Sequence, residues 1–213
     1  MIKVALLFDK GNDWISRYFV DYQVDRQKAK IDTFFEANEI RNYNLVFILG
    51  YTKILSNDFL LQNELNLVVH ESELPLGKSF APIQWQLLEG KNEIKISLIE
   101  ALEAVDSGDI FLQDFIQFDG TELYDEIREK QGKATLSIVT KFINIYPNFK
   151  RRKQKGRESF YRKRKILDGE LDINKTISEN FNLLRIGNNE GWPSFFYYKG
   201  KKYVLKIYKN NEN

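Results

Sequence analysis

The 213-residue sequence contains no cysteine and only one histidine, His70. Without cysteine the chain can form neither disulfide bonds nor thiolate metal sites, and a single imidazole is a poor zinc-binding set, so we expect no metal centre. No apolar run approaches the roughly 20 residues that a membrane-spanning helix needs. The run at residues 4–8 is followed at once by Asp9 and Lys10, unlike a signal peptide. We therefore expect a cytoplasmic protein with no membrane association.

An excess of charge of one sign is also missing. The chain has 32 basic and 30 acidic side chains and a formal net charge of +2, which argues against a general nucleic-acid binder. Cations do gather in a basic arm at residues 150–165, which also carries Phe160 and Tyr161. Most of this arm is expected to be a solvated charged surface. A nucleic-acid contact through it stays open as an alternative, and its affinity would fall steeply with salt.

Short, nearly continuous apolar runs recur at residues 3–8, 45–49 and 65–69. Such runs are typical of strands buried on both faces. Helical segments separate them: Ser56 is placed to cap a helix through Gln62, and residues 80–88 precede the stop signal Gly90. This alternation predicts an α/β fold with a Rossmann-like, mostly parallel sheet and helices on both faces. Further strands are expected at residues 30–35, 94–98 and 110–118.

The remaining segments divide the chain into two parts. Residues 121–146 have helical periodicity, with Gly132 expected to interrupt the helix, and a short helix capped by Asn12 or Asp13 is expected to run through Tyr18. Beyond the basic arm we predict a short helix at residues 177–186 and a β-hairpin around Gly200. We therefore assign residues 1–149 to the main domain and residues 150–213 to a basic linker with a small helix and hairpin appendage.

Candidate functional residues stand directly after predicted strands. His70 follows one strand, and Gly50 and Tyr51 follow the strand before it. The carboxyl ends of parallel strands form the edge where ligands bind in such sheets, and an imidazole exchanges protons near neutral pH. A lone histidine is more often structural than catalytic. Asp106 lies in a glycine-containing turn, where an aspartate commonly bonds its own backbone.

Two segments carry a resemblance to a known family. Residues 70–83, HESELPLGKSFAPI, and residues 105–110, VDSGDI, resemble motifs of the formyltransferases that use 10-formyltetrahydrofolate. Residues 45–54, LVFILGYTKI, resemble the strand and loop on the folate side of their site. The likeness continues through residues 155–164, 181–185 and 192–196. Two motifs in register are more specific than either alone, and residues 1–149 are thereby identified as a catalytic domain.

This resemblance implies a role for each candidate residue. His70 and Asp106 become the catalytic pair, with His70 stabilising an oxyanion or moving a proton and Asp106 orienting it. The residues expected to line the folate pocket are Gly50, Tyr51, Ile54, Ser107, Gly108 and Asp109. The residues expected to bind the second substrate are Trp14, Lys78, Ser79, Arg151 and Arg152, the two arginines because guanidinium groups suit phosphate oxygens.

One position departs from the family pattern. The family has Asn-x-His, with the amide holding the formyl oxygen, whereas this chain has Val68 two residues before His70. Asn66 is a candidate replacement because it shares the strand face of His70, but it lies four residues away, about 13 Å along an extended strand. A backbone N–H, Ser72 or a water molecule are the alternatives. Loss of one oxyanion donor can cost about 100-fold in rate.

The acceptor expected from the resemblance is the amine of a nucleotide-linked amino sugar. The segment after Lys150 is shorter than the barrel that the transfer-RNA enzymes append, and residues 9–14 resemble the N-terminal loop of the sugar enzymes. Formylation of phosphoribosylglycinamide or methionyl-tRNA stays open. So does a non-catalytic member that binds a folate or a partner, which Val68 would favour. The aromatic hairpin at residues 192–208 is a candidate homodimer contact.

Overall fold

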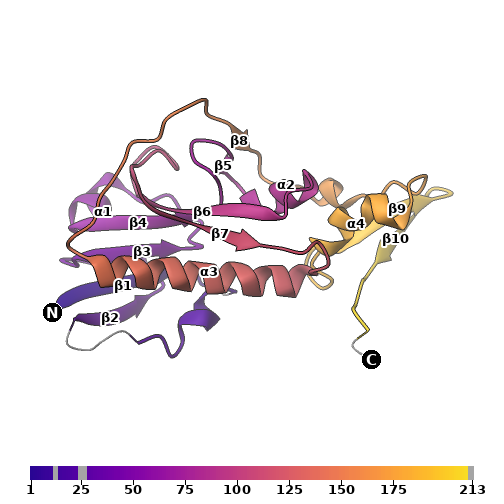
Figure 1. Cartoon of the computed structure of the whole chain (residues 1–213). Coiled ribbons are helices and arrows are strands. Elements are labelled where there is room, and N and C mark those ends of the chain that lie inside the picture. Colours follow the sequence, from indigo (N-terminus) through magenta and orange to yellow (C-terminus); the bar gives the residue numbers. More distant parts are fainter. Residues whose placement is uncertain (12–13, 24–27, 211–213) are drawn as a thin grey trace.

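A computed structural model describes residues 1–11, 14–23 and 28–210. A six-stranded sheet with the order β2-β1-β3-β4-β6-β7 forms its centre (Figure 1). The four strands β1 (Ile2–Phe8), β2 (Ala29–Phe34), β3 (Leu45–Leu49) and β4 (Leu65–His70) are parallel, whereas β6 (Glu93–Glu100) and β7 (Ile110–Gln117) run antiparallel to their neighbours. The mostly parallel α/β sheet predicted from the apolar runs is confirmed.

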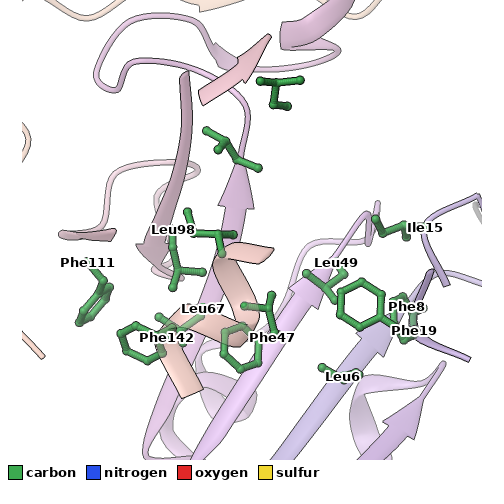
Figure 2. Packing of buried hydrophobic residues seen from close by; sticks show 14 of the residues in the cluster. Leu6, Phe8, Ile15, Phe19, Phe47, Leu49, Leu67, Leu98, Phe111 and Phe142 are labelled. Atoms are coloured by element: carbon green, nitrogen blue, oxygen red, sulfur yellow. The ribbon is translucent and has the colours of Figure 1, made fainter. Parts of the chain in front are cut away.

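The strands are buried on both faces because their alternate side chains enter separate apolar clusters. Leu6 and Phe47 pack toward the long helix α3 (Tyr124–Ile145), together with α2 (Pro82–Leu88) and the 3₁₀ helix η1 (Ser16–Phe19). Figure 2 shows the rings of Phe47, Phe111 and Phe142 meeting in this layer. Leu7 and Ile48 pack on the other face with α1 (Asn57–Leu61), which Ser56 caps as predicted.

The long helix α3 is continuous, so the predicted interruption at Gly132 is wrong. Gly132 is buried, and a Cβ added there would lie 2.3 Å from the Tyr18 ring. The glycine therefore marks a close approach between α3 and η1. Helical geometry costs glycine only about 1 kcal/mol relative to alanine, and the packing of the helix offsets this. The proposed caps of η1, Asn12 and Asp13, lie outside the described residues.

The C-terminal part forms a small subdomain beside the sheet. Following α3, the chain forms β8 (Phe160–Tyr161), which pairs with β5 (Lys78–Ser79), and then η3 (Ile166–Gly169) and α4 (Ile177–Arg185). The predicted hairpin is β9 (Ser194–Tyr198) and β10 (Lys201–Leu205). Lys199 and Gly200 turn it with positive φ values of 47° and 75°, as two-residue hairpin turns require. The 3₁₀ turn η2 (Ala37–Glu39) lies before β3.

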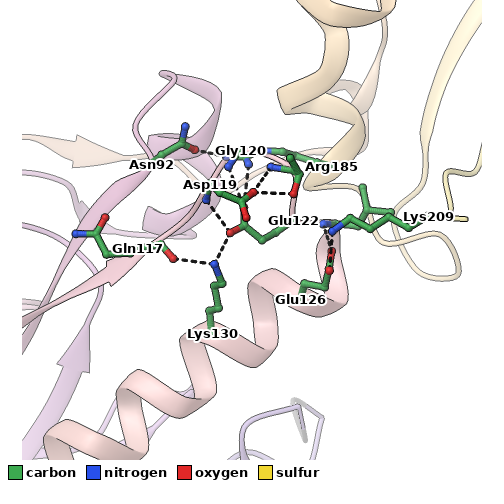
Figure 3. A network of polar contacts seen from close by, with 11 residues as sticks. Asn92, Gln117, Asp119, Gly120, Glu122, Glu126, Lys130, Arg185 and Lys209 are labelled. Carbon is green, nitrogen blue, oxygen red and sulfur yellow. Dashed lines mark hydrogen bonds and ion pairs between the residues drawn. The ribbon is translucent and has the colours of Figure 1, made fainter. Parts of the chain in front are cut away.

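A buried ionic network attaches α4 to the sheet (Figure 3). The Arg185 side chain is fully buried, and its guanidinium donates to Asn92 at 2.7 Å and faces Glu122 at 3.4 Å. Glu122 also accepts hydrogen bonds from the Asp119 and Gly120 backbone. A buried arginine is stable only with such compensation, so the network holds the two parts in a defined arrangement. No helix among the described residues is long and apolar enough to span a membrane.

Candidate active site

His70 is the last residue of β4 and is only 5% exposed. Its Nε2 lies 2.8 Å from the backbone oxygen of Gly77. A carbonyl oxygen can only accept a hydrogen bond, so Nε2 carries the proton of this contact. Gly77 has a φ of +68°, in the left-handed region that glycine enters without strain. The loop between β4 and β5 thus bends back to present its carbonyl to the ring.

Asp106 faces the other nitrogen of the same ring. Its Oδ2 lies 3.6 Å from His70 Nδ1, and both side chains are more than nine-tenths buried. The same oxygen accepts a hydrogen bond from the Ser79 backbone N–H at 2.8 Å. An imidazole protonated on both nitrogens satisfies the Gly77 carbonyl and the carboxylate together, whereas a neutral ring satisfies only Gly77. The arrangement is suited to holding and moving one proton in a site that excludes water.

The turn that carries Asp106 is tightly constrained. Asp106 has a φ of 51°, a conformation that aspartate tolerates better than most residues. A Cβ added to Gly108 would lie 2.0 Å from the Glu100 backbone oxygen, so only glycine fits there. Gln154 closes the turn by donating its amide to the Asp106 oxygen at 2.8 Å and to the Gly108 oxygen at 2.9 Å. These constraints account for the Asp-Ser-Gly-Asp pattern.

The loop after β3 holds the first set of predicted folate residues. Gly50 has a φ of +64°, Tyr51 is half-buried, and Ile54 is 89% exposed. The carboxylate of Asp9, directly after β1, binds both the hydroxyl and the backbone N–H of Thr52. The Thr52 hydroxyl, followed by the Gly11 N–H, lowers the pKa of Asp9. Asp9 therefore fixes the loop from its anchor on the neighbouring strand.

The second predicted set lies in the Asp106 turn. Ser107 donates its hydroxyl to the Ala104 oxygen at 2.6 Å. Asp109 lies 3.8 Å from the Nε of Arg151, which also faces Glu100 at 3.4 Å. The loops that carry the two sets approach the same apolar cluster, because Tyr51 in the loop after β3 and Ala101 in the loop after β6 both pack against it. The loops that we expect to hold the folate are therefore neighbours across the sheet.

The residues predicted to bind the second substrate are more dispersed. The buried ammonium of Lys78 contacts Glu158 at 2.5 Å, and the guanidinium of Arg152 donates to Gln113. Ser79 contributes its backbone N–H to Asp106. Arg151, 57% exposed, keeps donors that face solvent. The structure therefore brings Lys78 and Ser79 next to the histidine–aspartate pair. The side chains of Lys78 and Arg152, however, already contact other protein groups.

Trp14 reaches the site through a chain of contacts. The Arg128 guanidinium lies 4.4 Å from the centre of the Trp14 ring and donates to Gln131 at 2.8 Å. Gln131 in turn donates to Glu71, the residue after His70, at 2.6 Å. Trp14 is thus connected to the strand end that carries His70, although it does not touch the ring.

Asn66 is not brought to His70. Its amide donates to the Leu60 backbone oxygen at 2.9 Å, which commits it to the end of α1. Because β4 is a regular strand through both residues, four residues separate them by about 13 Å. The shared strand face was read correctly, but the geometry gives no contact. Val68 instead packs in an apolar cluster with Leu74, Ile99 and Ile110.

Gly77 lies in the motif at residues 70–83, whereas Gln154 and Ser159 were given no role at the site from the sequence. The Ser159 hydroxyl accepts the Gly77 N–H at 2.8 Å, and its backbone oxygen accepts the Lys78 N–H, at 2.9 Å, of the peptide whose carbonyl binds His70. Gly77 carried a signal, because a glycine after Pro75 marks a turn. Gln154 and Ser159 carried none, since both act on the backbone of segments far away in the chain and no local pattern records such a contact.

A mostly parallel central sheet with a buried histidine–aspartate pair at a strand end defines an α/β protein. The family described as formyl transferase matches residues 10–143, more than half of the chain. The chain therefore belongs to the formyl transferase family. A methionyl-tRNA formyltransferase of Caldicellulosiruptor saccharolyticus is 30% identical over 197 residues, 87% of this chain and 59% of that protein. The chain thus spans well under two thirds of this relative's length.

Solved structures share the fold. A methionyl-tRNA formyltransferase from Clostridium thermocellum superposes with a TM-score of 0.79 at 17% identity, covering 100% of this chain and 96% of that one. A sugar N-formyltransferase from a Shewanella species superposes with a TM-score of 0.69 at 12% identity and covers 100% of both chains. Identities this low establish the architecture and leave the substrate to be inferred from the site.

Proposed function

We propose that this protein transfers a formyl group from 10-formyltetrahydrofolate to the amine of a nucleotide-linked amino sugar. The observation that carries the proposal is the buried pair of His70 and Asp106, with 3.6 Å between Nδ1 and Oδ2, in a chain of the formyl transferase family. 10-Formyltetrahydrofolate is the formyl donor of this family. The acceptor follows from the sequence resemblance.

In the proposed reaction His70 handles the proton, and Asp106 supplies the negative charge beside it. An amine attacks only when uncharged and must lose a proton as the new bond forms, so a nearby group has to accept that proton. His70 accepts this proton, and the Asp106 carboxylate opposite Nδ1 stabilises the positive charge that the ring then carries; the proton passes on to the folate nitrogen as its bond to the formyl carbon breaks. The protonated His70 can offer an N–H to an oxygen on which negative charge develops. With Val68 in place of an amide, His70 and backbone N–H groups carry that stabilisation.

The loops beside the pair fit a flat heterocycle with an apolar face. The side chains of Ile54, Leu102 and Val105 are 89%, 49% and 60% exposed in the loops after β3 and β6. Apolar side chains exposed beside polar backbone are what a pterin ring needs, with carbonyl and N–H groups reading its edge. These residues and Tyr51 would hold the donor. When bound, it supplies the activated formyl group.

Formylation of methionyl-tRNA is the second candidate, because the relative at 30% identity carries that name. The two acceptors place different demands on the protein. A transfer RNA is a polyanion whose binding weakens steeply with salt, whereas a sugar nucleotide presents one pyrophosphate. Arg151, a half-exposed guanidinium beside the Asp106 turn that faces Glu100 and Asp109, suits the smaller ligand.

The experiment is an acceptor panel. Purified protein is incubated with 10-formyltetrahydrofolate and, separately, several nucleotide-linked amino sugars, phosphoribosylglycinamide and methionyl-tRNA, and the formylated products are identified by mass spectrometry. Formylation of an amino sugar nucleotide supports the proposal. Formylation of methionyl-tRNA alone replaces the sugar by the second candidate. No product with any acceptor, together with tetrahydrofolate binding by calorimetry, would identify a non-catalytic folate-binding member.

A further inference from the structure

A segment to which the sequence assigned no role at the site contacts both the histidine loop and the aspartate turn. Residues 152–161, here called the strap, leave the end of α3 and cross above β5 before they reach the C-terminal subdomain (Figure 1). Arg152 exchanges two backbone hydrogen bonds with Ile110, at 2.8 and 3.0 Å, which fixes the start of the strap on β7. Its end, β8, pairs with β5.

The first contact of the strap is with the aspartate turn. Gln154 spans the Asp106 and Gly108 carbonyls with one amide group, at 2.8 and 2.9 Å. These carbonyls belong to a turn in which Asp106 has a φ of 51°. A residue in the left-handed region persists only where surrounding contacts impose it. The Gln154 amide supplies those contacts and thereby holds the backbone that carries the Asp106 carboxylate.

The second contact is with the histidine loop. The Ser159 hydroxyl accepts the Gly77 N–H at 2.8 Å, while the Ser159 backbone oxygen accepts the Lys78 N–H at 2.9 Å. A Cβ added at Gly77 would lie 2.8 Å from Tyr161, so the strap also covers the glycine. The opposite end of the same residue, the Gly77 carbonyl, accepts the His70 Nε2 proton. The Ser159 backbone oxygen thus holds the peptide whose carbonyl orients the imidazole, and the Ser159 hydroxyl holds the peptide before it.

We propose that Gln154 and Ser159 are positioning residues, through which the strap sets the relative orientation of His70 and Asp106. This inference rests on the proposed function for its effect on turnover, but its structural content concerns the imidazole alone. Displacement of a reacting group by about 1 Å can cost 100-fold in rate. Loss of either side chain is therefore expected to lower kcat while KM for both substrates stays nearly constant.

The sole histidine makes a direct test available, because every imidazole signal in a ¹⁵N NMR spectrum belongs to His70. In the wild-type protein the Nε2 proton should exchange slowly with solvent, since Gly77 holds it in a buried site. Ser159→Ala should speed this exchange at least tenfold, and Ser159→Thr, which keeps the hydroxyl at an exposed position, should restore it. Gln154→Glu, which replaces the donating amide by a carboxylate of the same shape, should shift the Nδ1 resonance.

Kinetics and stability complete the test. Ser159→Ala and Gln154→Glu are each expected to reduce kcat by about tenfold or more, with Ser178→Ala and Gln62→Glu as matched controls on exposed positions of α4 and the end of α1. Variants that melt earlier but keep wild-type kcat and wild-type His70 signals would overturn the inference and leave the strap a structural element. If the wild-type protein formylates no acceptor, the proposed function fails, and the NMR comparison alone decides whether the strap positions His70.

Discussion

One carboxylate oxygen of Asp106 serves two loops at once: Oδ2 accepts the Ser79 backbone N–H at 2.8 Å and faces His70 Nδ1 at 3.6 Å. The hydrogen bond from Ser79 is the shorter contact, so it fixes where the oxygen lies. The imidazole meets a negative charge that is already held in place. Pre-set charge of this kind needs no rearrangement during a reaction, which is the physical basis of electrostatic catalysis.

Replacement of the imidazole tests the pair directly. His70→Asn can still donate an amide proton toward Gly77 but cannot accept and release a proton near neutral pH, and no other histidine can take its place. The expected loss in kcat is about 100- to 10,000-fold. The measurement is formyl transfer alongside the melting temperature. A folded variant with near wild-type turnover would remove His70 from the mechanism.

The close approach of Gly132 to Tyr18 predicts that Gly132→Ala lowers the stability of the protein, whereas Gly→Ala inside a helix usually raises it. Gly→Ala inside a helix ordinarily stabilises by roughly 0.5–1 kcal/mol. Here the added methyl would lie 2.3 Å from the Tyr18 ring, and overpacking costs about 1–3 kcal/mol. Gly132→Ala should therefore destabilise the wild-type protein, as followed by urea unfolding.

In a Tyr18→Ala background the obstruction is gone, and the same Gly132→Ala change should stabilise. A double-mutant cycle isolates this coupling. Equal effects of Gly132→Ala in the two backgrounds would mean that the ring moves aside without cost and that the close approach does not explain the glycine.

The buried strands and the proximity of His70 to Asp106 could be predicted from the sequence, whereas the role of Gly132 could not. Apolar runs such as residues 45–49 mark buried strands because nothing else in a small domain buries so many consecutive side chains. Gly132 was misread because a glycine that breaks a helix and one that admits a neighbouring ring look alike until the neighbour, Tyr18, is known. The family pattern led to Asp106, whose turn also forms because Gly108 alone fits against Glu100.

What the sequence could not supply are contacts made by backbone groups of distant segments. Gln154 and Ser159 bind carbonyl and N–H groups that every residue possesses, so residue type at the partner position carries no information. The prediction that Asn66 lies beside His70 is wrong for a related reason. Strand alternation gives the face of a side chain but not its partner, and the Leu60 carbonyl at the end of α1 was the nearer one.

The Asp9 carboxylate gives a prediction that depends on pH. Its pKa is lowered, chiefly by the Thr52 hydroxyl and then by the Gly11 N–H. A group whose pKa is lower in the folded protein contributes stability that is complete above its unfolded pKa, about 3.9 for aspartate. That contribution is lost as the pH falls through the folded pKa. Asp9→Asn should therefore lower the melting temperature at pH 7, and the difference from wild type should shrink below about pH 4.

Because Asp9 holds the loop at residues 50–54, Asp9→Asn should also raise KM for the formyl donor several-fold with little change in kcat. Asp21→Asn, an exposed carboxylate that follows η1, is the control. If the melting-temperature difference between Asp9→Asn and wild type is the same at pH 7 and pH 3, the lowered pKa of Asp9 does not stabilise the loop. A donor KM that matches the control would show that the loop does not meet the donor.

Restoring the amide that the family pattern has at position 68 tests whether this chain works with an incomplete oxyanion site. Val68 lies on β4 two residues before His70, on the same strand face, and packs with Leu74, Ile99 and Ile110. Val68→Asn would add an N–H donor beside the imidazole, and one such donor is worth about 100-fold in kcat. It would also bury an amide among apolar side chains, at a cost of about 1–3 kcal/mol. We expect kcat to rise while the melting temperature falls.

Val69→Asn is the matched control, because Val69 is also half-buried but faces the opposite layer of the sheet. It should lose stability without any gain in turnover. If Val68→Asn and Val69→Asn lower kcat alike, the active site does not lack an oxyanion donor, and the valine is part of how this member of the family carries out its reaction.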